Sequence, residues 1–340
     1  MGERNIAEAL LAYLRSTHGG AAIDFAAAPI PLTGGFDTTI LAFELDRAPT
    51  GLSGPLVLRL MRTPEHSDMV LREKATHDAL TSLEFPAPRV ILASTDCEPL
   101  AAPFLIMERL RGVNMWDDIL GPSGKLSRLF RLTQTLAEVQ ARLHALDARV
   151  YRDSLEGAGL NPDDFTLEGE VRSISARIER AELVGLRRGA EWLLTNVPEQ
   201  DGRVAICHGD FHPLNVVMDA GTFSGVVDWS QAIVAEPAYD VACTSVILRF
   251  GPVELSGVLR AIFERVRALP MRRYASGYRK RSTVDMRNAS YYEAMHVLSN
   301  LTFAGELAPD LPNPWGDPRT AAGLERFFAK RTGVEVALRP

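Results

Sequence analysis

The chain has 340 residues, 46% of them hydrophobic, and its 37 basic and 43 acidic side chains give a net charge of −6. This length allows one large domain or two lobes with ample core, and the slightly acidic balance argues against nucleic acid as the main partner. The cysteines Cys97, Cys207 and Cys243 show neither a disulfide framework nor zinc spacing, which favours a reducing compartment. With no signal-peptide pattern and no long apolar run, we expect a cytoplasmic protein that does not span a membrane.

The N-terminal third of the chain predicts a small α+β lobe around a mainly antiparallel sheet. Apolar periodicity changes between the helical and the strand pattern several times, with Pro- and Gly-rich turns between the runs. The expected elements are a helix over 5–17, strands over 40–45 and 56–61, a helix over 67–83, and strands over 89–94 and 104–108.

The remainder of the chain predicts a larger and mostly helical lobe. Its expected elements are a long helix over 126–146, a polar loop over 147–169, a helix over 170–195, a hairpin over 204–229, and helices after 239 with breaks near Pro252, Pro270 and 309–318. We place the boundary at residue 111, with an N-lobe over 1–111 and a C-lobe over 112–340.

Three polar side chains that can bind metal or move protons stand among short apolar runs: Asp210, Asn215 and Asp228. Phosphoryl transfer needs a carboxylate that orients the acceptor hydroxyl and takes its proton, together with oxygen ligands for Mg²⁺. Asp210 can be that base, and Asn215 and Asp228 can supply the metal oxygens if two strands of one hairpin bring them together.

A cation for the nucleotide phosphates is predicted on the strand over 56–61. The period of two places Val57, Arg59 and Met61 on one face, where Arg59 is the cation. Glu73, on the helix that follows, can pair with Arg59 and hold its guanidinium in place. These two residues therefore complement the three polar residues of the later motif.

The run His208-Gly209-Asp210-Phe211-His212-Pro213-Leu214-Asn215, followed by Val227-Asp228-Trp229, resembles the aminoglycoside phosphotransferase family, a small-molecule branch of the protein-kinase-like fold. The resemblance covers about residues 30 to 250 and implies a nucleotide-binding N-lobe and a C-lobe with the catalytic loop and acceptor site. It implies Mg²⁺-dependent transfer of the γ-phosphoryl group of ATP (or GTP) to a hydroxyl of a small molecule. Asp210 resembles the catalytic base, and Asn215 and Asp228 resemble the metal ligands.

Other positions take their expected roles from the resemblance. The nucleotide-binding positions are Gly34 and Gly35 in the covering loop, Glu73 beside the phosphate-binding cation, and Met107, Glu108 and Leu110 in the hinge that meets the adenine ring. Pro237-Ala238-Tyr239-Asp240 resembles an element whose acid braces the catalytic loop. Arg59 departs from the usual Lys, and the glycine loop lacks a full G-x-G-x-x-G.

Two other functions fit parts of the same pattern. A nucleotide-binding protein of this fold without turnover stays open because arginine at position 59 is bulkier and more forked than lysine. A metallohydrolase would use His208, Asp210, His212 and Asp228 as ligands, although a histidine such as His208 more often supports a loop.

The acceptor is not fixed by the sequence. The basic cluster over 272–281 fits an anionic acceptor or a solvated face, the acids over 163–170 fit a cationic acceptor or a solvated loop, and Tyr291, Tyr292, Met295 and Leu298 fit a pocket or the core. Because the late helices offer apolar, aromatic and basic residues, we expect an acceptor that is not highly cationic. The oligomeric state is not predicted.

Overall fold

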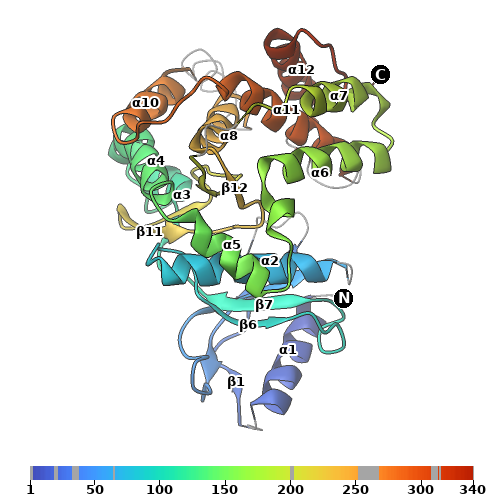
Figure 1. The fold of residues 1–340 in the computed structure, drawn as a ribbon. Coiled ribbons are helices and arrows are strands. Elements are labelled where there is room, and N and C mark those ends of the chain that lie inside the picture. The colour runs from blue at the N-terminus through green and yellow to red at the C-terminus, as the bar shows by residue number, and fades with distance from the viewer. Residues whose placement is uncertain are drawn as a thin grey trace. The chain divides into compact units, whose positions relative to one another are not determined.

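The computed structural model of the chain describes residues 3–18, 22–32, 38–63, 66–199, 203–251, 268–307, 313 and 315–339 (Figure 1). These residues form two compact units. Unit 1 consists of Met1–Val113, Arg149–Leu160 and Val217–Ser230, and unit 2 consists of Asn114–Ala148, Asn161–Val216 and Gln231–Pro340. The predicted assignment of nucleotide binding to residues 1–111 and of the catalytic loop and acceptor site to residues 112–340 remains a prediction.

Unit 1 is built on a five-stranded sheet in the order β2-β3-β5-β7-β6, and every neighbouring pair is antiparallel. Its strands are β2 (Ile30–Leu32), β3 (Thr38–Phe43), β5 (Leu56–Met61), β6 (Val90–Ser94) and β7 (Phe104–Glu108). The predicted antiparallel sheet is therefore confirmed. The predicted strand over 40–45 is wrong at its end, because β3 stops at Phe43 and β4 (Leu45–Asp46) pairs with β1 (Asp24–Phe25).

The two faces of this sheet pack against different helices. Leu56, Leu58 and Leu60 of β5 share a core with Leu10 and Leu14 of α1 (Glu3–Thr17). On the opposite face, Met61, Leu105 and Met107 pack with Val70 of α2 (Ser67–Ser82). Because side chains alternate along a strand, Arg59 faces the side of α2, as the period of two predicted.

A third helix of unit 1 was not predicted. α5 (Ala148–Gly157) occupies the stretch expected to be a polar loop, and Tyr151 and Leu155 are both fully buried. Thr76 Oγ1 donates to Tyr151 Oη over 3.2 Å, and Ser154 Oγ donates to the Ala75 carbonyl over 2.8 Å. The pattern was missed because few apolar residues at helical spacing stand within a polar sequence.

Unit 2 is mostly helical, as predicted. Its helices in the described residues are α3 (Met115–Leu120), α4 (Leu129–Leu143), α6 (Leu167–Arg180), α7 (Arg187–Thr195), α8 (Pro237–Phe250), α10 (Ala268–Arg279), α11 (Ala289–Glu306) and α12 (Pro318–Thr332). Their main core includes Phe328 and the four late residues that could have lined a pocket. Tyr291, Tyr292, Met295 and Leu298 thus belong to the core.

Two predicted helix boundaries in unit 2 are wrong. The expected helix over 170–195 is divided into α6 and α7, because Glu182 adopts φ 53° and a 3₁₀ turn, η4 (Val184–Leu186), follows it. Pro270 does not break α10, since proline is tolerated in a first helical turn. The expected break at Pro252 lies outside the described residues. In the expected break over 309–318, the described residues 313 and 315–317 are not helical and lie between α11 and α12.

The predicted single hairpin over 204–229 is also wrong. β9 (Ala205–Cys207) pairs with β12 (Ile233–Ala235), whereas β10 (Val216–Asp219) lies between β11 (Thr222–Val226) and β8 (Val113–Asn114). The tight turn at Ala220 and Gly221, with φ of 49° and 90°, joins β10 to β11 alone. Asp210 and Asn215 therefore lie between β9 and β10, and Asp228 lies between β11 and β12.

None of the helices in the described part of the chain combines the length and the apolar character needed to cross a bilayer.

Candidate functional site

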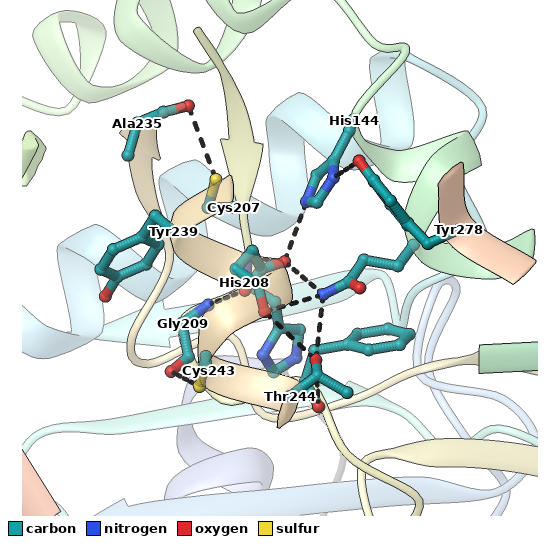
Figure 2. Close-up of polar contacts among 12 residues, drawn as sticks. His144, Cys207, His208, Gly209, Ala235, Tyr239, Cys243, Thr244 and Tyr278 are labelled. Carbon is teal, nitrogen blue, oxygen red and sulfur yellow. Dashed lines mark hydrogen bonds and ion pairs between the residues drawn. The ribbon is translucent and has the colours of Figure 1, made fainter. Parts of the chain in front are cut away.

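In unit 2, the loop after β9 is held by the buried carboxylate of Asp240, in the first turn of α8 (Figure 2). The backbone N–H of Gly209 donates to Asp240 Oδ1 over 2.9 Å, and that of His208 donates to Oδ2 over 3.2 Å. Gln140 Nε2 of α4 and Nε2 of His144, the C-cap of that helix, also donate to Oδ2, each over 3.0 Å. Asp240 thus braces the loop, as the resemblance implies.

The hydrogen-bond donors around Asp240 lower its pKa by more than its burial raises it. Burial acts to raise the pKa of this carboxyl, but the hydrogen bond from His144, the electrostatic effect of the His144 and His208 rings and the N–H of Gly209 lower the pKa to about 2. The carboxylate is therefore ionised over the whole physiological range of pH, and the brace stays intact.

Gly209 is required at its position by geometry. Its φ is +78°, and a Cβ added there would lie 2.2 Å from the carbonyl oxygen of Gln231. Cys243 Sγ donates to the Gly209 carbonyl over 2.9 Å, and Thr244 Oγ1 donates to the Phe211 carbonyl, also over 2.9 Å. α8 thus holds the loop by its side chains as well as by Asp240.

The braced loop brings Asp210 and Asn215 together. Asn215 Nδ2 donates to the Asp210 carbonyl over 2.9 Å and to its Oδ2 over 3.2 Å. Because both partners are acceptors, the amide nitrogen of Asn215 is fixed on this side, and none of the described contacts uses its oxygen. The side chain of Asp210 is 39% exposed, which leaves this carboxylate accessible.

Two histidines support this pair. His208 is fully buried, and its Nδ1 accepts from the Asp210 N–H over 3.2 Å. His212 Nδ1 accepts from the Leu214 N–H over 3.2 Å, so its Nε2 carries the proton of the neutral ring and donates to Asp210 Oδ2 over 3.3 Å. Both rings therefore shape the loop around the carboxylate.

In unit 1, three charged side chains predicted for the nucleotide site form one chain of ion pairs. Arg59 Nη1 lies 3.0 Å from Asp228 Oδ1, and Arg59 Nε lies 3.3 Å from Glu73 Oε2. The side chains of Arg59 and Glu73 are 11% and 2% exposed, whereas that of Asp228 is 32% exposed. The pairing of Arg59 with Glu73 predicted from the sequence is thus present, and Asp228 joins it.

Asp228 has an unusual backbone conformation. Its φ is +63°, in the left-handed region that aspartate tolerates better than most residues. Ser230 Oγ donates to the same Oδ1 that Arg59 contacts, over 2.9 Å. Trp229, fully buried, donates its indole N–H to the Val226 carbonyl over 3.0 Å and packs edge-on against Phe85. The anchored Trp229 holds the turn that presents Asp228.

Glu73 and its neighbour His77 have opposite pKa shifts with one main cause. Burial raises the pKa of Glu73 to about 7, helped by the charge of Asp228 and opposed by Arg59 and Arg72. Burial likewise lowers the pKa of His77 to about 4, against the effect of its Nδ1 hydrogen bond to the Pro88 carbonyl. A neutral His77 therefore lies beside Glu73, with 4.0 Å between Nε2 and Oε1.

The hinge residues lie at the end of β7. Met107 is buried in the core on the α2 side, and Glu108 is paired with Arg89 at 2.7 Å. The N–H groups of Glu108 and Arg109 donate to the Arg89 and Pro55 carbonyls, and no described backbone bond uses the N–H of Leu110. The residues expected to form the hinge therefore lie at or just beyond the end of β7, and their contact with a nucleotide base stays a prediction.

A pocket of about 610 Å³ in unit 1 includes two of these hinge residues. It is lined by Ser53, Pro55, residues 108–111, Asp219 and residues 222–224. Arg59, Glu73 and Asp228 are not part of its lining, so this hollow is separate from the chain of ion pairs.

Of the predicted site residues, Arg59, Glu73 and Asp228 meet in unit 1, and Asp210 and Asn215 meet in unit 2. Met107, Glu108 and Leu110 lie at the expected end of β7. Gly34 and Gly35 fall outside the described residues. Sequence reasoning missed Gln140 and His144, although two polar residues at i and i+4 beside Leu136, Val139 and Leu143 could have signalled a buried polar contact.

The ligand set suggested for a metallohydrolase gains no support. Among the described residues, the group whose metal-binding atoms lie within 4.8 Å of one another is His144, Cys207 and Asp240, not the set with His208 and His212. Both nitrogens of His144 are already bonded, and burial raises the pKa of the Cys207 thiol well above its usual range. A metal ligand must be deprotonated, so this buried group is a structural cluster.

Similarity to known proteins was found at the level of family and of sequence. The model of the phosphotransferase enzyme family matches residues 31–278. Acyl-CoA dehydrogenase family member 11 of Pongo abelii is 27% identical over 176 residues, covering 50% of this chain but only 22% of that longer protein. An aminoglycoside 3'-phosphotransferase of Streptomyces fradiae is 29% identical over 191 residues, which are 53% of this chain and 66% of the relative.

Solved structures with the same fold cover nearly the whole chain. A candidate aminoglycoside phosphotransferase from Ralstonia eutropha JMP134 has a TM-score of 0.63 at 16% identity, covering 96% of this chain and 98% of its own. A type I macrolide 2'-phosphotransferase has a TM-score of 0.57 at 17% identity, covering 99% and 98%. The ternary complex of APH(4)-Ia with ADP and hygromycin B has 0.54 at 18%, covering 96% and 98%. The predicted two-lobe, protein-kinase-like α+β fold is confirmed.

Proposed function

This chain belongs to the phosphotransferase enzyme family, as its motif predicted, and we propose that it transfers the γ-phosphoryl group of ATP (or GTP) to a hydroxyl of a small molecule in an Mg²⁺-dependent reaction. Asp210 is the catalytic base in this proposal. Asn215 and Asp228 hold Mg²⁺, and Arg59, braced by Glu73, contacts the phosphates. The adenine ring meets the hinge at Met107, Glu108 and Leu110, and Gly34 and Gly35 cover the nucleotide.

The observation that carries this proposal is the arrangement of Asp210 and Asn215 on the braced loop. Asp210 Oδ2 is held by Asn215 and His212, whereas none of the described contacts uses its Oδ1. A carboxylate fixed at one oxygen and 39% exposed can accept the hydroxyl proton at the other. Asp210 thus orients the acceptor oxygen for attack while the loop keeps the carboxylate from rotating.

The nucleotide side of the proposal rests on the chemistry of the donor set. Asp228 and Asn215 offer a carboxylate and an amide oxygen, which are the ligand types that Mg²⁺ takes. The bound ion would neutralise charge on the transferring phosphoryl group. Arg59 brings a permanent cation from the middle of the sheet, and its Nη1, at 3.0 Å from Asp228, has to divide its contacts between this carboxylate and the phosphates.

The replacement Asp210→Asn tests the base. It keeps the shape of the side chain but cannot accept the proton, so turnover should fall by about a hundredfold or more while nucleotide binding is retained. Turnover is followed by consumption of nucleotide, and binding by titration calorimetry. Asp163→Asn, on an exposed 3₁₀ turn, is the control and should leave both unchanged. Unaltered turnover in Asp210→Asn would contradict the proposal.

The replacement Asp228→Ala tests the metal ligand. It should remove the Mg²⁺-dependent part of nucleotide binding, seen as loss of the thermal shift that Mg-ATP produces over ATP alone. A normal Mg²⁺-dependent shift would exclude Asp228 as a ligand.

Two rival functions are separated by the same assays. A protein without turnover would bind Mg-ATP and phosphorylate none of the acceptors, and Arg59 in place of lysine is the feature that favours this rival. A metallohydrolase would retain zinc or iron through purification, which elemental analysis detects, whereas a kinase would bind Mg²⁺ weakly and together with nucleotide.

The acceptor is best found by a screen of nucleotide consumption over hydroxylated compounds. Aminoglycosides and macrolides belong in this set because structures with the same fold are phosphotransferases for them. Hydroxylated acyl-CoA thioesters belong in it because the longer relatives are named acyl-CoA dehydrogenase family member 11. The exposed basic residues of α10 favour an acceptor that is not highly cationic. We place the reaction in the cytoplasm, in keeping with three separate, unpaired cysteines.

A further inference from the structure

Two helices of unit 2 face each other with polar side chains in matching register. Tyr274 and Tyr278 of α10 are four positions apart, as are Gln140 of α4 and His144 at its C-cap, and all four side chains are buried. Residues at this spacing share one face of a helix. The helices can approach closely because a Cβ on Gly277 would already lie 3.2 Å from that of Ala137.

The pair formed by Tyr278 and His144 determines which nitrogen of His144 carries the proton. Tyr278 Oη lies 2.6 Å from Nδ1, and Asp240 Oδ2 lies 3.0 Å from Nε2 (Figure 2). The ionised Asp240 can only accept, so Nε2 must carry a proton. Burial raises the pKa of the Tyr278 phenol, which therefore keeps its proton and donates to Nδ1. Tyr278 thus selects the tautomer of His144 that donates to Asp240.

The pair formed by Tyr274 and Gln140 fixes the orientation of the Gln140 amide in the same way. The Tyr274 hydroxyl donates to Gln140 Oε1. With its oxygen occupied, Gln140 presents Nε2 to Asp240 Oδ2 over 3.0 Å and to the Asp240 carbonyl over 3.2 Å. A flipped amide would place an oxygen against a carboxylate, so Tyr274 favours the orientation that donates.

Both pairs end on the oxygen that also accepts the His208 N–H. Oδ2 of Asp240 takes the bonds from Gln140, His144 and the His208 backbone, while Oδ1 takes the Gly209 N–H. Asp210 is the next residue along the loop. The orientation of Asp240, and through it the position of Asp210, depends on two donors that α10 sets in place.

We propose that the hydroxyls of Tyr274 and Tyr278 are positioning groups for the catalytic loop: they set the tautomer of His144 and the amide of Gln140 so that both donate to Asp240, which holds Asp210 in place. The inference rests on the proposed function of Asp210, and it adds α10 to the parts of the chain on which turnover depends.

The kinetic test compares Tyr278→Phe, Tyr274→Phe and the double variant with wild type. Removing one oriented donor should lower kcat by about tenfold with little change in KM for nucleotide, and the double variant should lose more. Tyr291→Phe is the matched control, because its buried hydroxyl donates to the Leu193 carbonyl over 3.0 Å elsewhere in unit 2. The control should lose similar thermal stability and keep its kcat. Equal kcat values in Tyr278→Phe and Tyr291→Phe would overturn the proposal.

A spectroscopic test separates this inference from the proposed function. In protein labelled with ¹⁵N-histidine, the His144 signals, identified by their loss in His144→Gln, should report the Nε2–H tautomer, and Tyr278→Phe should introduce the Nδ1–H form. Tyr291→Phe should leave these signals unchanged. An Nδ1–H or doubly protonated ring in wild type would overturn the proposal. Wild type could phosphorylate no acceptor and still show the Nε2–H tautomer, with the Nδ1–H form introduced by Tyr278→Phe. In that case the proposed function fails, whereas the positioning of His144 by Tyr278 stands.

Discussion

Glu73 in unit 1 and Asp240 in unit 2 are carboxylates with the same burial and opposite pKa shifts. Their side chains are 2% and 0% exposed. Burial is the largest cause acting on both and raises the pKa of each, yet the pKa of Glu73 ends near 7 and that of Asp240 near 2.

The difference lies in directed hydrogen bonds. Asp240 accepts from two backbone N–H groups and from two side chains at 2.9 to 3.2 Å. Glu73 has Arg59 at 3.3 Å and His77 at 4.0 Å, and it shares Arg59 with Asp228. Several short donors stabilise a buried charge, whereas one shared cation does not offset desolvation. Asp240 is therefore ionised over the physiological range of pH, whereas Glu73 can change its protonation near neutral pH.

Asp240→Asn tests whether the directed donors stabilise the buried charge of Asp240, and it should cause the largest loss of stability. The amide NH₂ would face donors that now meet a carboxylate oxygen, and breaking a buried charged network costs about 3–5 kcal/mol. Urea denaturation measures the loss. Glu236→Gln is the matched control, since this carboxylate is 6% exposed and accepts hydrogen bonds from the neutral side chains of Tyr292 and Asn288. A loss no larger than that of the control would contradict the role given to Asp240.

Gly209→Ala tests the same brace from the backbone. The left-handed φ and the contact of 2.2 Å with the Gln231 carbonyl should together cost about 2–4 kcal/mol and lower turnover, because the N–H that reaches Asp240 would shift. Gly159→Ala has the same φ of +78° and nothing within 4 Å of its Cβ, so it isolates the conformational cost, about 1 kcal/mol. Equal losses in the two variants would show that the close contact relaxes without consequence.

The ion pairs of unit 1 were largely predictable because they follow local patterns. The period of two in β5 placed Arg59 on the face of α2, and a helix over 67–83 brought Glu73 to that face. Asp228 was found by its spacing, although the predicted hairpin that was to carry it was wrong. Its pairing with Arg59 joins residues 169 apart and could not be read from either segment alone.

The support of the loop that carries Asp210 was much less predictable. Gln140, His144 and the α10 tyrosines stand on faces otherwise occupied by apolar residues, where the helical period indicates a core. Their partner, Asp240, lies 96 residues or more from the two α4 residues along the chain. Pattern reasoning identifies which face is buried but not which buried polar groups meet, because that depends on tertiary packing.

Glu73→Gln tests the raised pKa of Glu73 through the pH dependence of stability. The folded-state pKa of about 7 lies above the ordinary value of 4.5, so the stability that Glu73 contributes is full below 4.5 and is lost as the pH rises to about 7. The advantage of wild type over Glu73→Gln should shrink over this window by at most about 3 kcal/mol. His77 contributes equally to both proteins, so the difference isolates Glu73. Urea denaturation at pH 4.5 to 8 measures it, with Glu156→Gln, at an exposed position, as control. A difference independent of pH would place the pKa of Glu73 near its ordinary value.

Ser230→Ala tests whether Asp228, the more exposed end of the ion-pair chain, needs directed donors as Asp240 does. The hydroxyl donates to Asp228 Oδ1 over 2.9 Å, the same oxygen to which Arg59 Nη1 donates over 3.0 Å. Losing one bond to a charged group that is 32% exposed should cost about 0.5–1.5 kcal/mol, which would weaken Mg-nucleotide binding by about two- to tenfold in titration calorimetry. Ser245→Ala removes a buried hydroxyl that donates to the Val241 carbonyl within α8 and should leave that affinity unchanged. Unaltered affinity in Ser230→Ala would mean that the turn at Trp229 and the strained backbone suffice to orient Asp228. A loss larger than tenfold would mean that this carboxylate, like Asp240, depends on each of its donors.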